Sequence, residues 1–237
     1  NVPCVTIGSW CDFMNQGSIA RFQGRNTKGG PHSRGHQHLV IGPWLHGRLN
    51  KGNRVGGLEY PENAAWPVEE HMVGWFNHYL KGEQNAAEEE PAVRYYVMGA
   101  VGEKDAPGNN WRLAKTFPPS TDSTSYYLKA DGNLNLNQST SARGATSYES
   151  DPYHPMQIPG RSFPGARDAR PFEQQSEVLT FTTKPLIEPV EWTGRVQAEI
   201  YLSSTARDTD LIVRVSDVYP DGRSILIVDY PWRVRYR

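Results

Sequence analysis

Residues 39–47 read Leu39-Val-Ile-Gly-Pro-Trp-Leu-His46-Gly47, an apolar run that stops at a Gly-Pro break and is followed by a histidine. Short apolar runs bounded by Gly and Pro are typical of buried parallel strands. A second run, from Val2 to Ile7, leads into Gly8-Ser-Trp-Cys-Asp12. The two runs predict strands of an α/β enzyme, with an aspartate and then a histidine on the loops that follow them.

The segments around these runs extend the α/β pattern over residues 1–85. Strands are expected at Val2–Ile7 and His38–Gly42, with a helix over Phe13–Gln23 between them. The expected inner face of that helix consists of Phe13, Ile19 and Phe22.

A second helix is expected from Pro67 to Lys81, because Pro suits the first turn and Gly82 suits the C-terminal cap. Its apolar residues recur at helical spacing, which predicts packing on a sheet. These residues are Val68, Met72, Trp75, Phe76 and Tyr79.

The acidic stretch Glu83–Pro91 predicts a linker and a domain boundary near residue 85. Beyond it, strand patterns separated by Gly, Pro and Asp turns predict an all-β sandwich, interpreted as a jelly roll over residues 86–237. The strand candidates are Val93–Met98, Ser125–Lys129, Glu177–Thr183, Val196–Ser204, Asp210–Val218 and Ser224–Asp229.

The composition excludes two classes of partner. With 25 Lys+Arg against 26 Asp+Glu, the chain lacks the basic excess that a nucleic-acid surface needs. No window approaches 18 apolar residues, so no membrane span is expected. The chain opens with Asn1-Val-Pro-Cys, without an initiator Met or a signal peptide, and is therefore expected to be part of a longer polypeptide. Cytoplasmic, periplasmic and secreted locations all stay open.

Asp12 and His46 occur in the order in which an α/β-hydrolase presents the acid and base of its triad. Such a carboxylate fixes the imidazole tautomer and favours the imidazolium, and the histidine takes a proton from the nucleophile. The alternative is an aspartate that caps the following helix and a histidine that ends a strand. Cys11 is expected to be a packed thiol rather than a nucleophile, because a neighbouring carboxylate suppresses the thiolate.

Acyl-transfer chemistry of this kind requires no cofactor, and none is predicted. The remaining histidines do not form a metal site with Cys or carboxylate partners at suitable spacing. Of these, His36 and His38 could point to one face, and His154 lies in a predicted loop.

The segments that carry Asp12 and His46 resemble those of the CocE/NonD hydrolases, the X-Pro dipeptidyl-peptidase (S15-type) serine hydrolase family. Gly8-Ser-Trp-Cys-Asp-Phe, with Gly17 after it, resembles the family pattern GGWYD-x-F, and residues 38–47 resemble its histidine segment. Trp75-Phe-Asn-His-Tyr-Leu-Lys-Gly82 resembles the family's WFD-x-WLKG helix end. Later segments, among them Asp208-Thr-Asp210, resemble its C-terminal jelly-roll domain.

The resemblance implies that residues 1–85 are the C-terminal part of an α/β-hydrolase domain, with Asp12 as acid and His46 as base. It also implies a substrate that is a small ester, an amide or a peptide. Trp10 and Trp44 flank the two positions, and each either lines the acyl pocket or packs beneath the loops.

The chain departs from the family at the nucleophile. The family serine lies in a G-x-SY-x-G elbow upstream of the acid, whereas Ser9 and Ser18 have no such flanks. The chain alone is therefore expected to lack covalent catalysis. A non-catalytic β-sandwich module that binds carbohydrate or peptide is the alternative function.

The short sheet over residues 1–85 is expected to expose an apolar edge and face. The expected partners for these surfaces are residues 86–237, another copy of the chain, or the N-terminal part of the same enzyme.

Overall fold

The computed structural model describes residues 2–47, 53–87, 89–120, 122–138, 144–156 and 166–236. The chain divides into two compact units. One contains Asn1–Ser120 with the short pieces Pro164–Ala166 and Thr193–Val196, and the other contains Thr121–Phe163, Arg167–Trp192 and Gln197–Arg237.

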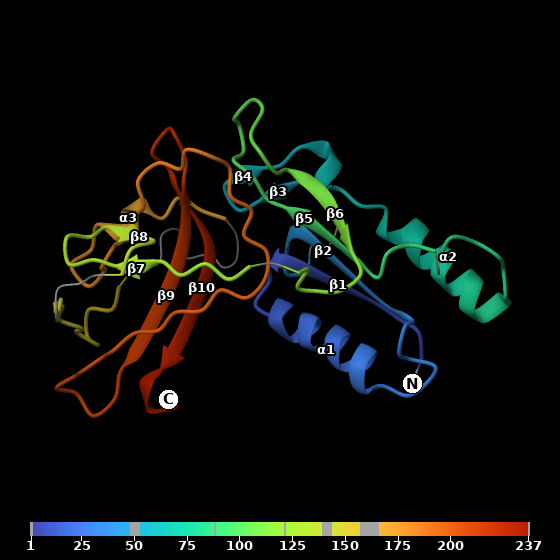
Figure 1. The fold of residues 1–237 in the computed structure, drawn as a ribbon, viewed down its shortest axis with the longest axis horizontal. Helices are drawn as coiled ribbons and strands as arrows, with labels where there is room; N and C mark the ends of the chain where they lie inside the picture. The colour runs from blue at the N-terminus through green and yellow to red at the C-terminus, as the bar shows by residue number, and fades with distance from the viewer. Residues whose placement is uncertain are drawn as a thin grey trace. The chain divides into compact units, whose positions relative to one another are not determined.

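The first unit is built on a mixed sheet with the strand order β1-β2-β5-β6. Strands β1 and β5 both run parallel to β2, and β6 runs antiparallel to β5. Figure 1 shows α1 lying along this sheet. The elements of the unit are β1 (Cys4–Cys11), α1 (Asn15–Lys28), β2 (Gln37–Leu45), β3 (Arg54–Val55), β4 (Leu58–Glu59), the 3-10 turn η1 (Glu62–Ala64), α2 (Val68–Lys81), β5 (Val93–Val97) and β6 (Asn110–Ala114).

Strand β2 is the centre of the core. All but the last of its residues are buried, as expected for a parallel strand covered on both faces. Leu39 and Ile41 pack with Phe22 of α1 on one face. Val40 and Trp44 pack with Trp66 on the other.

Gly42 allows the indole of Trp44 to fold back over the strand. A Cβ atom at position 42 would lie 2.4 Å from Cε2 of that ring. The glycine in the Gly-Pro break therefore has a packing role as well as a turn preference.

Helix α2 has the predicted extent but not the predicted packing. Trp75 is buried, whereas Met72 and Phe76, which were expected to pack on the sheet, are exposed. Figure 1 shows α2 projecting beyond the sheet. The apolar stripe is therefore longer than the surface available to it in the first unit.

The start of α1 also differs from the prediction. The helix begins at Asn15 rather than at Phe13, and the Phe13 side chain is exposed instead of facing the core. Phe22 is buried and Ile19 partly buried, in agreement with the predicted inner face.

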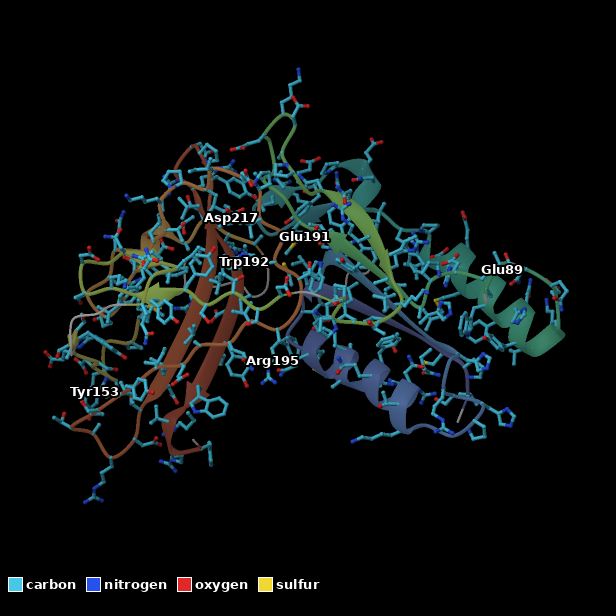
Figure 2. The ribbon with its side chains drawn as sticks, viewed as in Figure 1. Glu89, Tyr153, Glu191, Trp192, Arg195 and Asp217 are labelled. Carbon is cyan, nitrogen blue, oxygen red and sulfur yellow. The ribbon has the colours of Figure 1, made fainter. Side chains whose placement is uncertain are left out.

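The second unit has less regular structure than the sequence predicts. Its main feature is the antiparallel hairpin of β9 and β10, and Figure 2 labels Tyr153 and Trp192 on segments without helix or strand. Its elements are β7 (Tyr127–Leu128), β8 (Leu134–Asn135), α3 (Arg170–Glu173), β9 (Asp210–Val218), β10 (Ser224–Arg233) and the 3-10 turn η3 (Val234–Tyr236).

Two predicted strands, Glu177–Thr183 and Val196–Ser204, are not strands in the structure. Thr182 forms one isolated bridge with Asn133. In the part of the chain that the structure describes, the segment 196–204 pairs with no strand. The alternation in residues 196–204 suits a sheet, but a strand also needs a neighbour for its backbone N–H and C=O groups.

The predicted domain boundary near residue 85 stays a prediction, and the compact units themselves divide after Ser120. The physical reason is that β5 and β6 continue the first sheet, so backbone hydrogen bonds hold residues 93–114 in the first unit.

Candidate active site

Strands β1 and β2 deliver Asp12 and His46 to the same edge of the sheet. The strands are parallel, with Ser9 opposite Gly42 and, after a register shift between Ser9 and Cys11, Cys11 opposite Leu45. Asp12 is the residue after β1, and His46 is the residue after β2. The two side chains therefore start from adjacent strand ends, as the sequence predicted.

His46 and Asp12 are joined directly. Nδ1 of His46 lies 3.0 Å from Oδ1 of Asp12. The aspartate side chain is 13% exposed and the histidine side chain 48% exposed. An ionised carboxylate can only accept a hydrogen bond, so a neutral imidazole in this contact donates from Nδ1 and has its lone pair on Nε2. This is the tautomer that a general base needs.

The start of α1 holds the Asp12 carboxylate in place. Oδ1 of Asp12 also accepts a hydrogen bond of 2.7 Å from the backbone N–H of Met14, which closes an Asx turn. The backbone oxygen of Asp12 accepts from the N–H of Asn15, the first residue of the helix. The positive end of a helix favours an anion at this place. Asp12 thus combines contact with His46 and a local role at the helix start.

Phe13 contacts the His46 ring, whereas the sequence pattern predicted it on the inner face of the following helix. Its ring lies 4.6 Å from the His46 ring, centroid to centroid, with 36° between the planes. The only sequence signal was its position beside Asp12. Because Phe13 precedes α1, its side chain turns toward the loop after β2 instead of toward the core.

Trp44 and Trp10 both donate an indole hydrogen bond to a backbone oxygen of the first unit. Trp44 is 1% exposed, and its indole N–H donates a 3.0 Å hydrogen bond to the Ala64 oxygen. The Trp10 N–H donates to the Tyr96 oxygen at 2.6 Å, and its ring packs near Phe117. Both indoles thus make packing contacts in the first unit, and a role of either in an acyl pocket stays a prediction.

Within the part of the chain that the structure describes, no serine or cysteine side chain is hydrogen-bonded to His46. Ser9 is fully buried, and its hydroxyl has no hydrogen-bond partner. Ser18 lies on α1. Burial raises the pKa of the Cys11 thiol to about 11, which suppresses the thiolate.

The structure contains a second Asp–His pair, which has a different setting. His154 Nδ1 lies 2.6 Å from Oδ2 of Asp151, but the two residues are only three apart in one exposed segment. No strand end positions this pair, so it is a useful control for the first.

Two further histidines, His38 and His71, pack against tryptophan rings. His38 is buried, and its ring lies 4.9 Å from that of Trp75. Burial lowers the pKa of His71, with a smaller opposing effect from Glu90 and a further lowering effect from Arg94.

Over the described residues, no group of three or more His, Cys, Asp or Glu side chains could hold a metal ion. Over the same ranges, no helix combines the length and the apolar character needed to cross a membrane. An open pocket formed around Tyr60 and Glu103 includes neither Asp12 nor His46.

Comparisons with known proteins agree with this architecture. Residues 85–237 match the family described as the X-Pro dipeptidyl-peptidase C-terminal non-catalytic domain. Over 217 residues the chain is 35% identical to the cocaine esterase of Rhodococcus sp. (strain MB1 Bresler), covering 84% of this chain and 36% of that protein.

Two solved structures share the fold over the whole chain. An α-amino acid ester hydrolase superposes with a TM-score of 0.77 at 24% identity, and this chain covers 42% of it. An aminopeptidase from a marine sediment Thaumarchaeota archaeon superposes with a TM-score of 0.75 at 23% identity, with 41% of that chain covered. The chain thus spans about two fifths or less of the length of these proteins.

Proposed function

Because this chain belongs to the CocE/NonD (X-Pro dipeptidyl-peptidase, S15-type) family of hydrolases, we propose that it is part of a serine hydrolase. The enzyme cleaves ester or amide bonds, with X-Pro dipeptides as one candidate substrate class. Asp12 and His46 supply the acid and the base of its triad, and the nucleophilic serine comes from outside residues 1–237.

The mechanism follows from the hydrogen bond between His46 and Asp12. The lone pair on Nε2 of His46 takes the proton of the serine hydroxyl as the serine oxygen attacks the acyl carbon. Asp12 stabilises the imidazolium that results. The same proton then passes to the leaving alcohol or amine as the acyl-enzyme forms. Water, deprotonated by His46, releases the acid and restores the serine.

The single observation that carries this proposal is the 3.0 Å contact between side chains that follow two adjacent parallel strands. The Asp151–His154 pair shows that a short Asp–His distance alone is not specific. The specific feature is the position of both residues at the carboxyl edge of one sheet, where α/β folds bind ligands.

The further strands of the hydrolase sheet have a natural place beside β1. In the described residues, β1 lies at the edge of the sheet and its one strand neighbour is β2. An edge strand presents unpaired N–H and C=O groups. We place the further parallel strands of the hydrolase domain there, the serine-bearing strand among them, so that their carboxyl ends reach the edge that carries Asp12 and His46.

The exposed apolar side of α2 supports the same arrangement. Met72, Val73, Phe76 and Leu80 are exposed on this helix. The remainder of the α/β-hydrolase domain is the proposed cover for these residues, and a second copy of the chain is the alternative. We also propose that the second unit is part of a jelly-roll domain whose further strands pair with the β9–β10 hairpin.

A fusion tests the catalytic assignment. The part of the cocaine esterase that precedes its match to this chain is joined to residues 1–237, and hydrolysis of a p-nitrophenyl ester is measured. His46→Ala is expected to lower kcat by several orders of magnitude. His154→Ala is the matched control and should leave kcat unchanged. Near-normal turnover by the His46→Ala fusion contradicts the assignment.

One observation favours a second candidate function, the binding of a carbohydrate or peptide by the second unit. Tyr230 and Trp232 are both exposed on β10, with ring centroids 6.2 Å apart. Exposed aromatic rings offer flat apolar faces to a ligand. A glycan and peptide array probed with the whole chain, and with the Trp232→Ala variant, tests this function. If the whole chain binds no ligand on the array, or if Trp232→Ala binds every ligand that the wild type binds, the result argues against this function.

A further inference from the structure

We infer that Phe13 is a positioning residue for His46: its ring packs on one face of the imidazole and keeps Nδ1 directed at Asp12. The inference rests on the proposed function, because it assigns a role in the same site. It concerns a side chain that touches the base and not the reacting atoms.

The need for such a residue follows from how weakly the His46 side chain is held. The imidazole is 48% exposed, and its described hydrogen bond is the single contact with Oδ1 of Asp12. A ring held at one atom can rotate about its Cβ–Cγ bond. Such a rotation replaces Nδ1 by a carbon atom at the carboxylate and moves Nε2 out of line.

Phe13 opposes this rotation by contact with the ring face. The two centroids are 4.6 Å apart, which lies in the range of packed aromatic pairs, and the planes are inclined by 36°. A turn of the imidazole about Cβ–Cγ would bring its edge into the phenyl ring.

The backbone explains why Phe13 has this position. The Asx turn formed by Asp12 and the Met14 N–H fixes the chain between β1 and α1. Phe13 is the central residue of that turn. The turn that orients the carboxylate therefore also orients the ring that covers the base.

Exposure argues for a local role rather than a structural one. Phe13 is 61% exposed, and it does not belong to the core clusters around Leu39 and Val40. A side chain that contributes little to the core can be replaced without unfolding the unit. The variants needed to test the inference should therefore be well folded.

The test measures the tautomer of His46 in the chain as it exists. The ¹⁵N shifts of the imidazole report the ratio of the Nδ1–H to the Nε2–H form, and the His46→Gln spectrum assigns the signals. The wild-type chain should show mainly the Nδ1–H form. Phe13→Ala should lower the ratio several-fold, because a freely rotating imidazole in water is no longer held at Asp12.

Two further variants separate positioning from disruption of the loop. Phe13→Tyr retains the ring and should restore the wild-type ratio. Met14→Ala shortens the neighbouring exposed side chain, leaves the backbone N–H that binds Asp12, and should also behave as wild type. Amide spectra confirm that each variant is folded.

An unchanged ratio in Phe13→Ala overturns the inference while the Asp12–His46 pair stands. An equal loss in Met14→Ala also overturns it, because the effect would then come from the loop and not from the ring. A wild-type chain with mainly the Nε2–H form contradicts the pair itself, and this inference with it.

Discussion

His46 Nδ1 and Asp12 Oδ1 are 3.0 Å apart, although 34 residues separate the two positions in the chain. The connection is made by the sheet: β1 and β2 are adjacent and parallel, and the strands end one residue before Asp12 and His46 respectively. The segment between them folds as α1 and returns the chain to the same edge, which is the ordinary result of a parallel crossover.

Trp44 is expected to contribute to stability rather than to substrate binding. Trp44→Phe removes the indole N–H that donates to Ala64 and leaves a buried carbonyl unsatisfied, which costs about 1–3 kcal/mol. Urea unfolding measures the loss. Trp192→Phe, at an exposed tryptophan, is the control and should have little effect. A Trp44→Phe chain as stable as the wild type would return Trp44 to the pocket hypothesis.

Two glycines should respond in opposite directions to replacement by alanine. Gly42→Ala places a Cβ atom 2.4 Å from the Trp44 ring and should destabilise the first unit. Gly17 lies on α1 with no atom within 4 Å of such a Cβ, so Gly17→Ala should stabilise the unit by about 0.5–1 kcal/mol. The urea midpoints of the two variants give the comparison. A neutral Gly42→Ala would show that the indole can move aside.

Cys11 is expected to be a slow thiol. Burial raises its pKa to about 11, against about 8.5 for a free cysteine, so at pH 8 its thiolate fraction falls by about two orders of magnitude. A Cys4→Ser chain, in which Cys11 is the remaining thiol, should react with iodoacetamide correspondingly slowly. The same chain unfolded in urea is the control. Labelling of the folded chain at the unfolded rate would contradict the buried position.

His71 should make the folded state sensitive to acid. Burial lowers its pKa, so the unfolded chain takes up a proton at a higher pH than the folded chain does. The contribution of His71 to the free energy of unfolding is fully present above about pH 6.5, the ordinary pKa of histidine. It is lost as the pH falls through the lowered pKa of the folded state. Urea midpoints of the wild type should therefore drop from pH 7 to pH 5.

His71→Gln should reduce this drop, while His154→Gln, at an exposed histidine, should not. Equal pH dependence in the wild type and in His71→Gln would show that the pKa of His71 is the same in both states.

The sequence predicted the parts of the fold that depend on local pattern and strand order. Strand β9 has the predicted bounds, and the order strand, helix, strand placed Asp12 and His46 together. Periodicity could not show which apolar faces find a partner. Phe76 fits the stripe of α2 but is exposed, because the first unit offers no surface opposite it. Tyr201 lies in an alternating segment that has no neighbouring strand among the described residues, and Tyr201 is 92% exposed.

The site was predictable to the same extent. The contact between Asp12 and His46 followed from residue type and position after a strand, and their roles as acid and base are proposals. The stacking of Phe13 on His46 did not, since it depends on the helix starting two residues later than its pattern indicated. The packing of Trp44 could not be predicted either, because its indole ring lies over Gly42. The two residues are only two apart in the chain, and hydrophobic periodicity does not describe contacts over so short a separation.

We propose that Asp12 holds His46 in the tautomer of a general base, and the imidazole ¹⁵N spectrum of the chain reports that tautomer. We expect mainly Nδ1–H in the wild type and in the Asp151→Ala control, and mainly Nε2–H in Asp12→Ala. A wild-type His46 with mainly Nε2–H, or a spectrum unchanged by Asp12→Ala, would contradict it.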